Sequence, residues 1–140
     1  PLFRYRSNDI AEVLWSDFGE DGLLRMRFKI IGRSDEMLVI KGVNFFPQSL
    51  SSVINEFEPK VSRNFRIVRP AAKDPGSLHV ILETPLAVGD EQATLTTSMQ
   101  KRVAEMLQVK ISITWVALDR LVQDGNKSKY LIENANEILK

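Results

Sequence analysis

The residues best suited to chemistry lie in three short polar segments of the chain. The first ends at Asp9, the second runs from Gly32 to Glu36, and the third surrounds Lys127. An aspartate can accept hydrogen bonds from a sugar diol, Arg33 can pair with a ribose or phosphate oxygen, and a lysine can neutralise charge on a transferring phosphate. Together these residue types suit a nucleotide. On physics alone, a solvated loop between two sheets is the simpler explanation of the second segment.

Other kinds of site find no support in the sequence. The chain has no cysteine and no cluster of ligands that suits a metal ion, so no metal site is predicted. The single histidine, His79, has no serine, cysteine or carboxylate constellation, which favours a structural or solvent-facing role. The sequence contains no glycine-rich loop of the phosphate- or dinucleotide-binding type. A formal net charge of +1 argues against nucleic acid or a membrane surface as a partner.

The sequence also gives an expectation about the compartment. No apolar run approaches the length that crosses a bilayer, and no secretory leader precedes the first expected strand. Together with the lack of cysteine, this predicts a cytoplasmic protein. The chain begins with Pro1 rather than methionine, which is consistent with a fragment of a larger protein.

The first part of the chain, residues 1–31, is expected to form short strands with turns. Along residues 24–30 apolar and basic residues alternate, so that Leu24, Met26, Phe28 and Ile30 share one face. A few short strands cannot make a core by themselves. This segment therefore needs a partner to cover its apolar face.

From residue 37 onward the pattern changes to alternating strands and helices. Lys41-Gly42 is expected to form the tight turn of a hairpin over residues 37–46. Further elements follow in order: a helix at 47–58, strands at 64–70 and 78–85, a helix at 90–107 and a strand at 110–117. This order predicts an α+β fold, a small split βαβ-type sheet with two helices on one face. After Asp119 come a polar loop and a helical-looking tail at 130–140.

Two stretches of the sequence resemble a known family. PLFRYRSND (1–9) and IGRSDEMLVIKGVNFFPQSL (31–50) closely resemble the C-terminal portion of phenylacetate-CoA ligases, within the adenylate-forming acyl-CoA synthetase superfamily. The resemblance extends over essentially the whole chain. It implies a strand-rich end of a large N-terminal adenylation domain at 1–31, a hinge at 32–36 and a C-terminal lid at 37–140. Enzymes of this family convert a carboxylic acid to an acyl-adenylate and then to a CoA thioester, and the lid swings between two poses.

The resemblance implies a role for each candidate residue. Asp9 matches the aspartate that accepts from the ribose hydroxyls, Arg33 the arginine that contacts the nucleotide near its ribose, and Asp35 the pivot of the hinge. Gly42 falls where the hairpin approaches the active site in the thioester pose. Lys127 aligns with the lid lysine that contacts the acyl phosphate, and Lys129 is its rival.

The same resemblance implies the partners of the parent enzyme. ATP with Mg²⁺ and coenzyme A would be cosubstrates bound mainly by the missing N-terminal domain, so the isolated chain is expected to be inactive. The acid would be an aryl acid such as phenylacetate, and a homodimer is left open. Two alternatives stand beside this interpretation: the lid of an adenylating enzyme that loads a carrier protein, and a stand-alone ligand-binding or interaction module.

Overall fold

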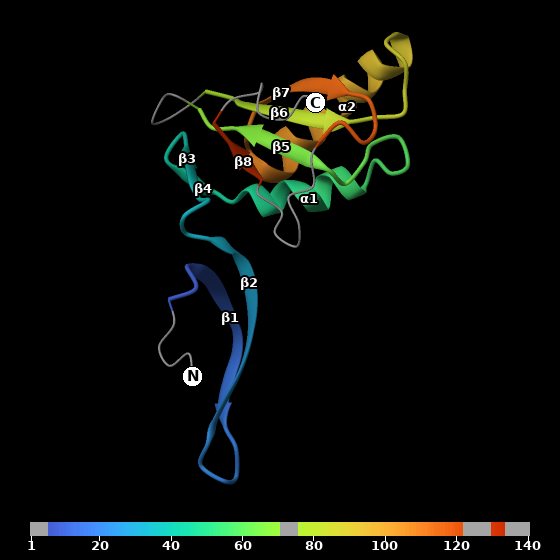
Figure 1. The fold of residues 1–140 in the computed structure, drawn as a ribbon. Coiled ribbons are helices and arrows are strands. Elements are labelled where there is room, and N and C mark those ends of the chain that lie inside the picture. The colour runs from blue at the N-terminus through green and yellow to red at the C-terminus, as the bar shows by residue number, and fades with distance from the viewer. Residues whose placement is uncertain (1–5, 71–75, 122–129, 134–140) are drawn as a thin grey trace.

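A two-stranded ribbon projects from the rest of the molecule (Figure 1). The computed structural model describes residues 6–70, 76–121 and 130–133. The ribbon consists of β1 (Asp9–Phe18) and β2 (Leu24–Arg33), which pair in antiparallel fashion. Residues 1–6 begin the segment expected to form short strands, and of these only Arg6 lies within the described residues.

The ribbon has one apolar and one charged face. Val13 lies opposite Phe28 and Phe18 opposite Leu24, whereas Glu12 lies opposite Lys29 on the other face. The predicted alternation along β2 is confirmed by this register, because residues that face one another across a ladder share a side of the sheet. The apolar side chains stay largely in solvent, with Phe18 69% and Phe28 55% exposed.

A short hairpin follows the ribbon. It consists of β3 (Leu38–Ile40) and β4 (Val43–Phe45), which form a separate two-stranded sheet. Lys41 and Gly42 join the two strands with φ angles of 51° and 77°. Two positive φ angles are typical of the primed turns that match strand twist, so the predicted tight turn is confirmed.

The helices cover one face of a four-stranded sheet with the order β7-β6-β5-β8 (Figure 1). Its strands are β5 (Phe65–Val68), β6 (Leu78–Glu83), β7 (Ile111–Val116) and β8 (Leu131–Ile132), and the helices are α1 (Pro47–Asn55) and α2 (Asp90–Leu107). Alternate residues of β5 and β6 share one buried cluster with both helices: Phe65, Ile67, Leu78, Val80, Leu82, Leu50, Val53, Ile54, Leu95, Met99 and Val103. The predicted α+β class with both helices on one face is confirmed.

The membership of the sheet differs from the expectation in two respects. The β3–β4 hairpin pairs only with itself in the described sheets, and the fourth strand of the large sheet is β8. Residues 131–132 were expected in a helical tail, but they pair in parallel with β5. The Ile67 amide donates to the Tyr130 carbonyl at 2.7 Å, and the Arg69 amide donates to the Ile132 carbonyl at 2.7 Å. These backbone bonds outweigh the helical pattern of the tail at this point. Residues 134–140 lie outside the described residues.

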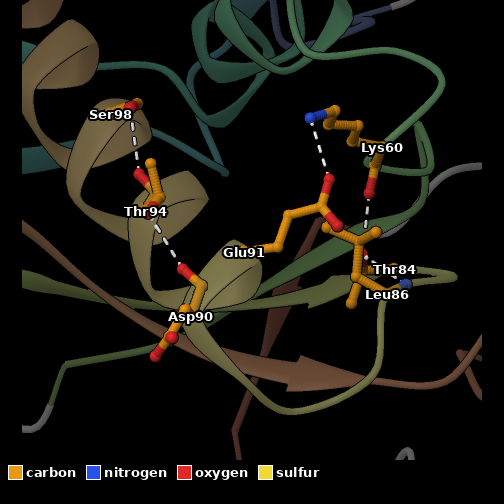
Figure 2. Close-up of polar contacts among 7 residues, drawn as sticks. All are labelled: Lys60, Thr84, Leu86, Asp90, Glu91, Thr94 and Ser98. Atoms are coloured by element: carbon orange, nitrogen blue, oxygen red, sulfur yellow. Dashed lines mark hydrogen bonds and ion pairs between the residues drawn. The ribbon is translucent and has the colours of Figure 1, made fainter.

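The start of α2 is tied to a neighbouring loop by polar contacts (Figure 2). Gly89, at its N-cap position, makes no side-chain capping bond. Lys60 instead contacts Glu91 of the first turn at 3.0 Å, and the buried Thr84 hydroxyl donates to the Lys60 carbonyl at 2.7 Å while accepting from the Leu86 amide. At the other end of α2, Arg102 binds Glu56 with a two-pronged ion pair. The first turn of α2 is thus tied to the loop after α1, and its C-terminal half is tied to Glu56 at the end of α1.

Among the described residues, no helix combines the length and the apolar character that a membrane crossing requires.

Candidate functional site

The predicted nucleotide-binding residues meet at the base of the ribbon. Asp9 opens β1 and Arg33 closes β2, and the two residues are direct partners in the ladder. Antiparallel pairing therefore places side by side two polar residues that lie far apart in the sequence. The negative charge of Asp9 is close enough to help raise the pKa of the Arg33 guanidinium.

Arg33 also binds the predicted pivot residue. Its Nε lies 3.0 Å from one carboxylate oxygen of Asp35, and its Nη2 lies 2.7 Å from the other. This side-chain hydrogen bonding is the main cause that raises the pKa of Arg33 and lowers the pKa of Asp35. Both side chains remain about half exposed to solvent. The pair is therefore accessible to a ligand as well as internally satisfied.

The arrangement suits hydroxyl groups better than a bare phosphate. A guanidinium carries five N–H donors, and Asp35 engages only part of this fork. The carboxylate of Asp9 can accept hydrogen bonds from a diol, while acidic neighbours weaken the attraction of the cluster for a further anion. The chemistry on offer is a ribose-like diol held between a carboxylate and an arginine.

The segment 32–36 is only partly a turn. Gly32 and Arg33 belong to β2, and residues 34–36 form the turn that follows it. The Ser34 amide donates to the Asn8 carbonyl at 2.8 Å, which ties the turn back to the start of β1. Glu36, the last residue of the segment assigned to the hinge, is partly buried, and that burial raises the pKa of its carboxyl, helped by the nearby charge of Asp35.

The remaining predicted site residues lie elsewhere. Gly42 sits at the tip of the β3–β4 hairpin, and a Cβ added there would meet no atom within 4 Å. Lys127 and its rival Lys129 lie outside the described residues. His79 is exposed on β6, with its Nε2 2.8 Å from the Thr114 hydroxyl, in line with a solvent-facing role.

Residues 122–129 contain both Lys127 and Lys129 and are called the lysine segment here. The residues that flank this segment are held by defined contacts. On its N-terminal side, the Leu121 amide donates to a carboxylate oxygen of Glu83 at 2.7 Å, and both residues are buried. On its C-terminal side, the ring of Tyr130 stacks on Phe65 with centroids 4.9 Å apart. The sequence did not single out Glu83. The available signal was weak, because Glu83 is the last residue of β6 and looks like an ordinary polar residue at the end of a strand.

A surface cleft of about 460 Å³ lies next to the base of the ribbon, between β2 and α1. It is lined by Lys29, Ile30, Ile31, Phe46, Gln48, Ser49, Ser51, Ser52 and Asn55. Within the part of the chain that the structure describes, no group of three or more histidine, cysteine or acidic residues could hold a metal ion.

Comparisons with known sequences agree on one kind of protein. Residues 42–135 match the model of the family described as "AMP-binding enzyme C-terminal domain". A phenylacetate-coenzyme A ligase of Pseudomonas putida is 41% identical over 137 residues, which is 95% of this chain and 30% of that protein. The Escherichia coli enzyme of the same name is 31% identical over 123 residues, 87% of this chain and 26% of that protein. The chain therefore spans about a quarter to a third of the length of these relatives.

Solved structures show the same fold. A 2-hydroxyisobutyryl-CoA ligase in the postadenylation state aligns with a TM-score of 0.74 at 23% identity, covering 94% of this chain and 29% of that one. A domain of a phenylacetate-coenzyme A ligase from Bacteroides vulgatus aligns with a TM-score of 0.56 at 19% identity, covering 69% of this chain and 91% of that one. Both alignments extend over most of the chain.

Proposed function

Because the chain belongs to the AMP-binding enzyme C-terminal domain family, we propose that it is the C-terminal portion of an AMP-forming acid-CoA ligase. The resemblance to phenylacetate-CoA ligases is confirmed by the matched relatives. The names of those relatives support an aryl acid such as phenylacetate as the substrate. The observation that carries the proposal is the meeting of Asp9, Arg33 and Asp35 where the ribbon joins the α+β unit.

The proposed reaction has two steps. A carboxylate oxygen of the acid first attacks the α-phosphate of ATP, which forms the acyl-adenylate and releases pyrophosphate. The thiol of coenzyme A then loses its proton and attacks the acyl carbonyl, which forms the thioester and releases AMP. Mg²⁺ would enter with ATP, and none of its ligands is assigned to this chain.

The described residues have defined parts in this scheme. Asp9 accepts hydrogen bonds from the ribose hydroxyls, and Arg33 donates to the nucleotide with the N–H groups that Asp35 does not engage. Asp35 is the pivot about which residues 37–140, the lid, turn relative to residues 1–31. Residues 32–36 form the hinge, and Gly42 leaves room for the thiol arm in the second pose.

The ribbon supports a larger parent protein. Its apolar face exposes Val13, Phe18, Leu24, Met26, Phe28 and Ile30, and each of these side chains is at least 42% exposed. An exposed apolar face of this kind normally packs against another element, since burial of apolar surface drives folding. The proposed cover is the N-terminal adenylation domain of the same protein, which would hold most of the contacts to ATP, acid and CoA.

Replacement of the proposed catalytic lysine is the most direct test of the function. In full-length protein, Lys127→Ala should slow phenylacetate-dependent exchange of labelled pyrophosphate into ATP by about 100–1000-fold, the loss expected when one charge-stabilising donor is removed from a transition state. Thioester formation from supplied phenylacetyl-adenylate and CoA should stay nearly unchanged. Lys129→Ala is the matched control, with an unchanged exchange rate expected.

Three results would change the assignment. If Lys129→Ala slows exchange and Lys127→Ala does not, the lysine has been placed wrongly. If wild-type protein exchanges pyrophosphate but transfers the acyl group only to a carrier-protein thiol, the enzyme is a carrier-loading one. If wild-type protein shows no acid-dependent exchange, the ligase proposal itself fails.

A further inference from the structure

Gly32 is required by a neighbour rather than by its own backbone. It is buried in β2, where it pairs with Ile10, and its φ lies outside the positive range that favours glycine. A Cβ built on Gly32 would lie 2.5 Å from Cδ1, 2.8 Å from Cγ and 3.0 Å from Cβ of Phe46. Two of these separations are shorter than real Cβ contacts, so the Phe46 side chain lies against the Gly32 backbone at a distance that only glycine permits.

Phe46 is held in place at the start of α1 in the α+β unit. It follows the buried Phe45 of β4 and occupies the N-cap position of α1, directly before the buried Pro47. Its carbonyl accepts from the Ser49 amide at 2.9 Å and from the Ser49 hydroxyl at 2.6 Å. Because the close approach reaches back to Cβ, turning the ring about χ1 cannot relieve all of it.

The contact spans the proposed hinge. Between Gly32 and Phe46 lie the polar turn at 34–36 and the β3–β4 hairpin, so this contact joins the ribbon to the α+β unit across that turn. Rotation of one part against the other would therefore act directly on this contact. Arg33 directly follows Gly32 in the strand, so the same contact sets where Arg33 lies relative to the α+β unit.

We propose that Gly32 and Phe46 are positioning residues that hold the ribbon at one angle to the α+β unit. The importance of this angle for nucleotide binding rests on the proposed function, but the contact itself does not. A side chain at position 32 would push Phe46 away and tilt the ribbon. Loss of the Phe46 ring would leave the angle poorly defined.

A distance measurement on the chain itself tests this proposal. The sequence has no cysteine, so Glu20→Cys at the exposed turn of the ribbon and Lys101→Cys on the exposed face of α2 provide unique sites for nitroxide labels. Double electron–electron resonance then reports the distance distribution without ATP, acid or CoA. The result is therefore independent of whether the ligase proposal holds.

The expected results follow from the close approach. Gly32→Ala should shift the mean distance, and Phe46→Ala should broaden the distribution. In the Phe46→Ala background, Gly32→Ala should cause a much smaller shift, because most of the obstructing atoms are gone. The matched control is Gly76→Ala, whose added Cβ meets nothing within 4 Å and should leave the distribution unchanged.

Two outcomes would overturn the proposal. One is a distribution that Gly32→Ala leaves unchanged, and the other is an equal shift with and without the Phe46 ring. Should Gly32→Ala alone fail to fold by circular dichroism, recovery of folding in the double variant is the expected result. If neither Gly32→Ala nor the double variant folds, the test rests on Phe46→Ala alone. A label-to-label distance distribution in Phe46→Ala as narrow as that of the wild type then overturns the proposal.

Discussion

Replacement of Glu83 tests how the residues beside the lysine segment are held. This carboxylate is 1% exposed, on the face of the sheet that also carries the small cluster of Ile81, Leu121 and Ile132. One of its oxygens accepts from the Leu121 amide at 2.7 Å and the other from the Asn64 side-chain amide at 3.1 Å. Glu83 therefore joins β6 to the point where the chain enters the lysine segment.

The magnitude follows from these two bonds. Hydrogen bonds to a charged group contribute about 1.5–3 kcal/mol each and neutral ones about 0.5–1.5 kcal/mol. Glu83→Gln keeps the shape of the side chain but offers only one acceptor oxygen. It therefore loses one of the two hydrogen bonds to the carboxylate, and the remaining bond is weaker because its acceptor is neutral. The smaller desolvation cost of a neutral amide opposes this loss. We expect the free energy of unfolding to fall by about 2 kcal/mol in Glu83→Gln, and by about 3–5 kcal/mol in Glu83→Ala, which leaves the buried Leu121 amide without its acceptor.

Urea unfolding at neutral pH measures this difference. The urea concentration at the midpoint should fall, while the dependence of the unfolding free energy on urea concentration should stay unchanged. Glu105→Gln is the matched control, because this exposed residue of α2 lies 4.0 Å from Lys101, and a surface change of this kind alters stability by no more than about 0.5 kcal/mol. Hydrogen exchange at the Leu121 amide should accelerate in Glu83→Ala and not in the control. The reasoning fails if Glu83→Gln destabilises no more than Glu105→Gln, or if Leu121 exchange is unaffected.

Two further predictions concern the hinge and the hairpin. Arg33→Gln should raise the pKa of Asp35, which carbon NMR of the Asp35 carboxyl can follow. Because pairing with Arg33 lowers the pKa of Asp35 in the folded chain, the pair stabilises the fold at neutral pH. This stabilisation is lost as the pH falls through the lowered pKa. An Asp35 titration unchanged by Arg33→Gln would contradict the ion pair. Gly42→Ala and Gly42→Leu should each cost about 1–2 kcal/mol in urea unfolding, because both place an L side chain at positive φ. In full-length protein only the leucine variant should slow thioester formation, and an equal loss in both variants would mean that the turn is merely strained.

Much of this molecule could be predicted from local sequence patterns. The alternation at Leu24, Met26, Phe28 and Ile30 indicated one apolar face, and the ladder shows it. The helical spacing in residues 47–58 predicted α1, which ends at Asn55. The Lys41-Gly42 dipeptide predicted a tight turn, and both residues have positive φ. Each of these features depends on residues within a few positions of one another, which is the range over which backbone geometry repeats.

The family resemblance likewise came from contiguous residues, and it identified Asp9, Arg33 and Asp35 as candidates. It did not indicate that Asp35 would engage Arg33 with both oxygens, because that depends on how the turn at 34–36 folds back. Nor could it assign a reason for Gly32. The reason is the Phe46 side chain, which only the packing of the ribbon against the start of α1 brings near.

The tertiary structure alone decided the fourth strand of the sheet and the place of Glu83. Two residues, Leu131 and Ile132, are too few to show a strand period, and they became a strand because the edge of β5 offered unpaired backbone groups. Glu83 looked like an ordinary polar residue near the end of a strand, yet the Leu121 amide made it a buried acceptor. Local periodicity determines which elements form, whereas partners distant in the sequence determine which backbone edges and buried polar groups are satisfied.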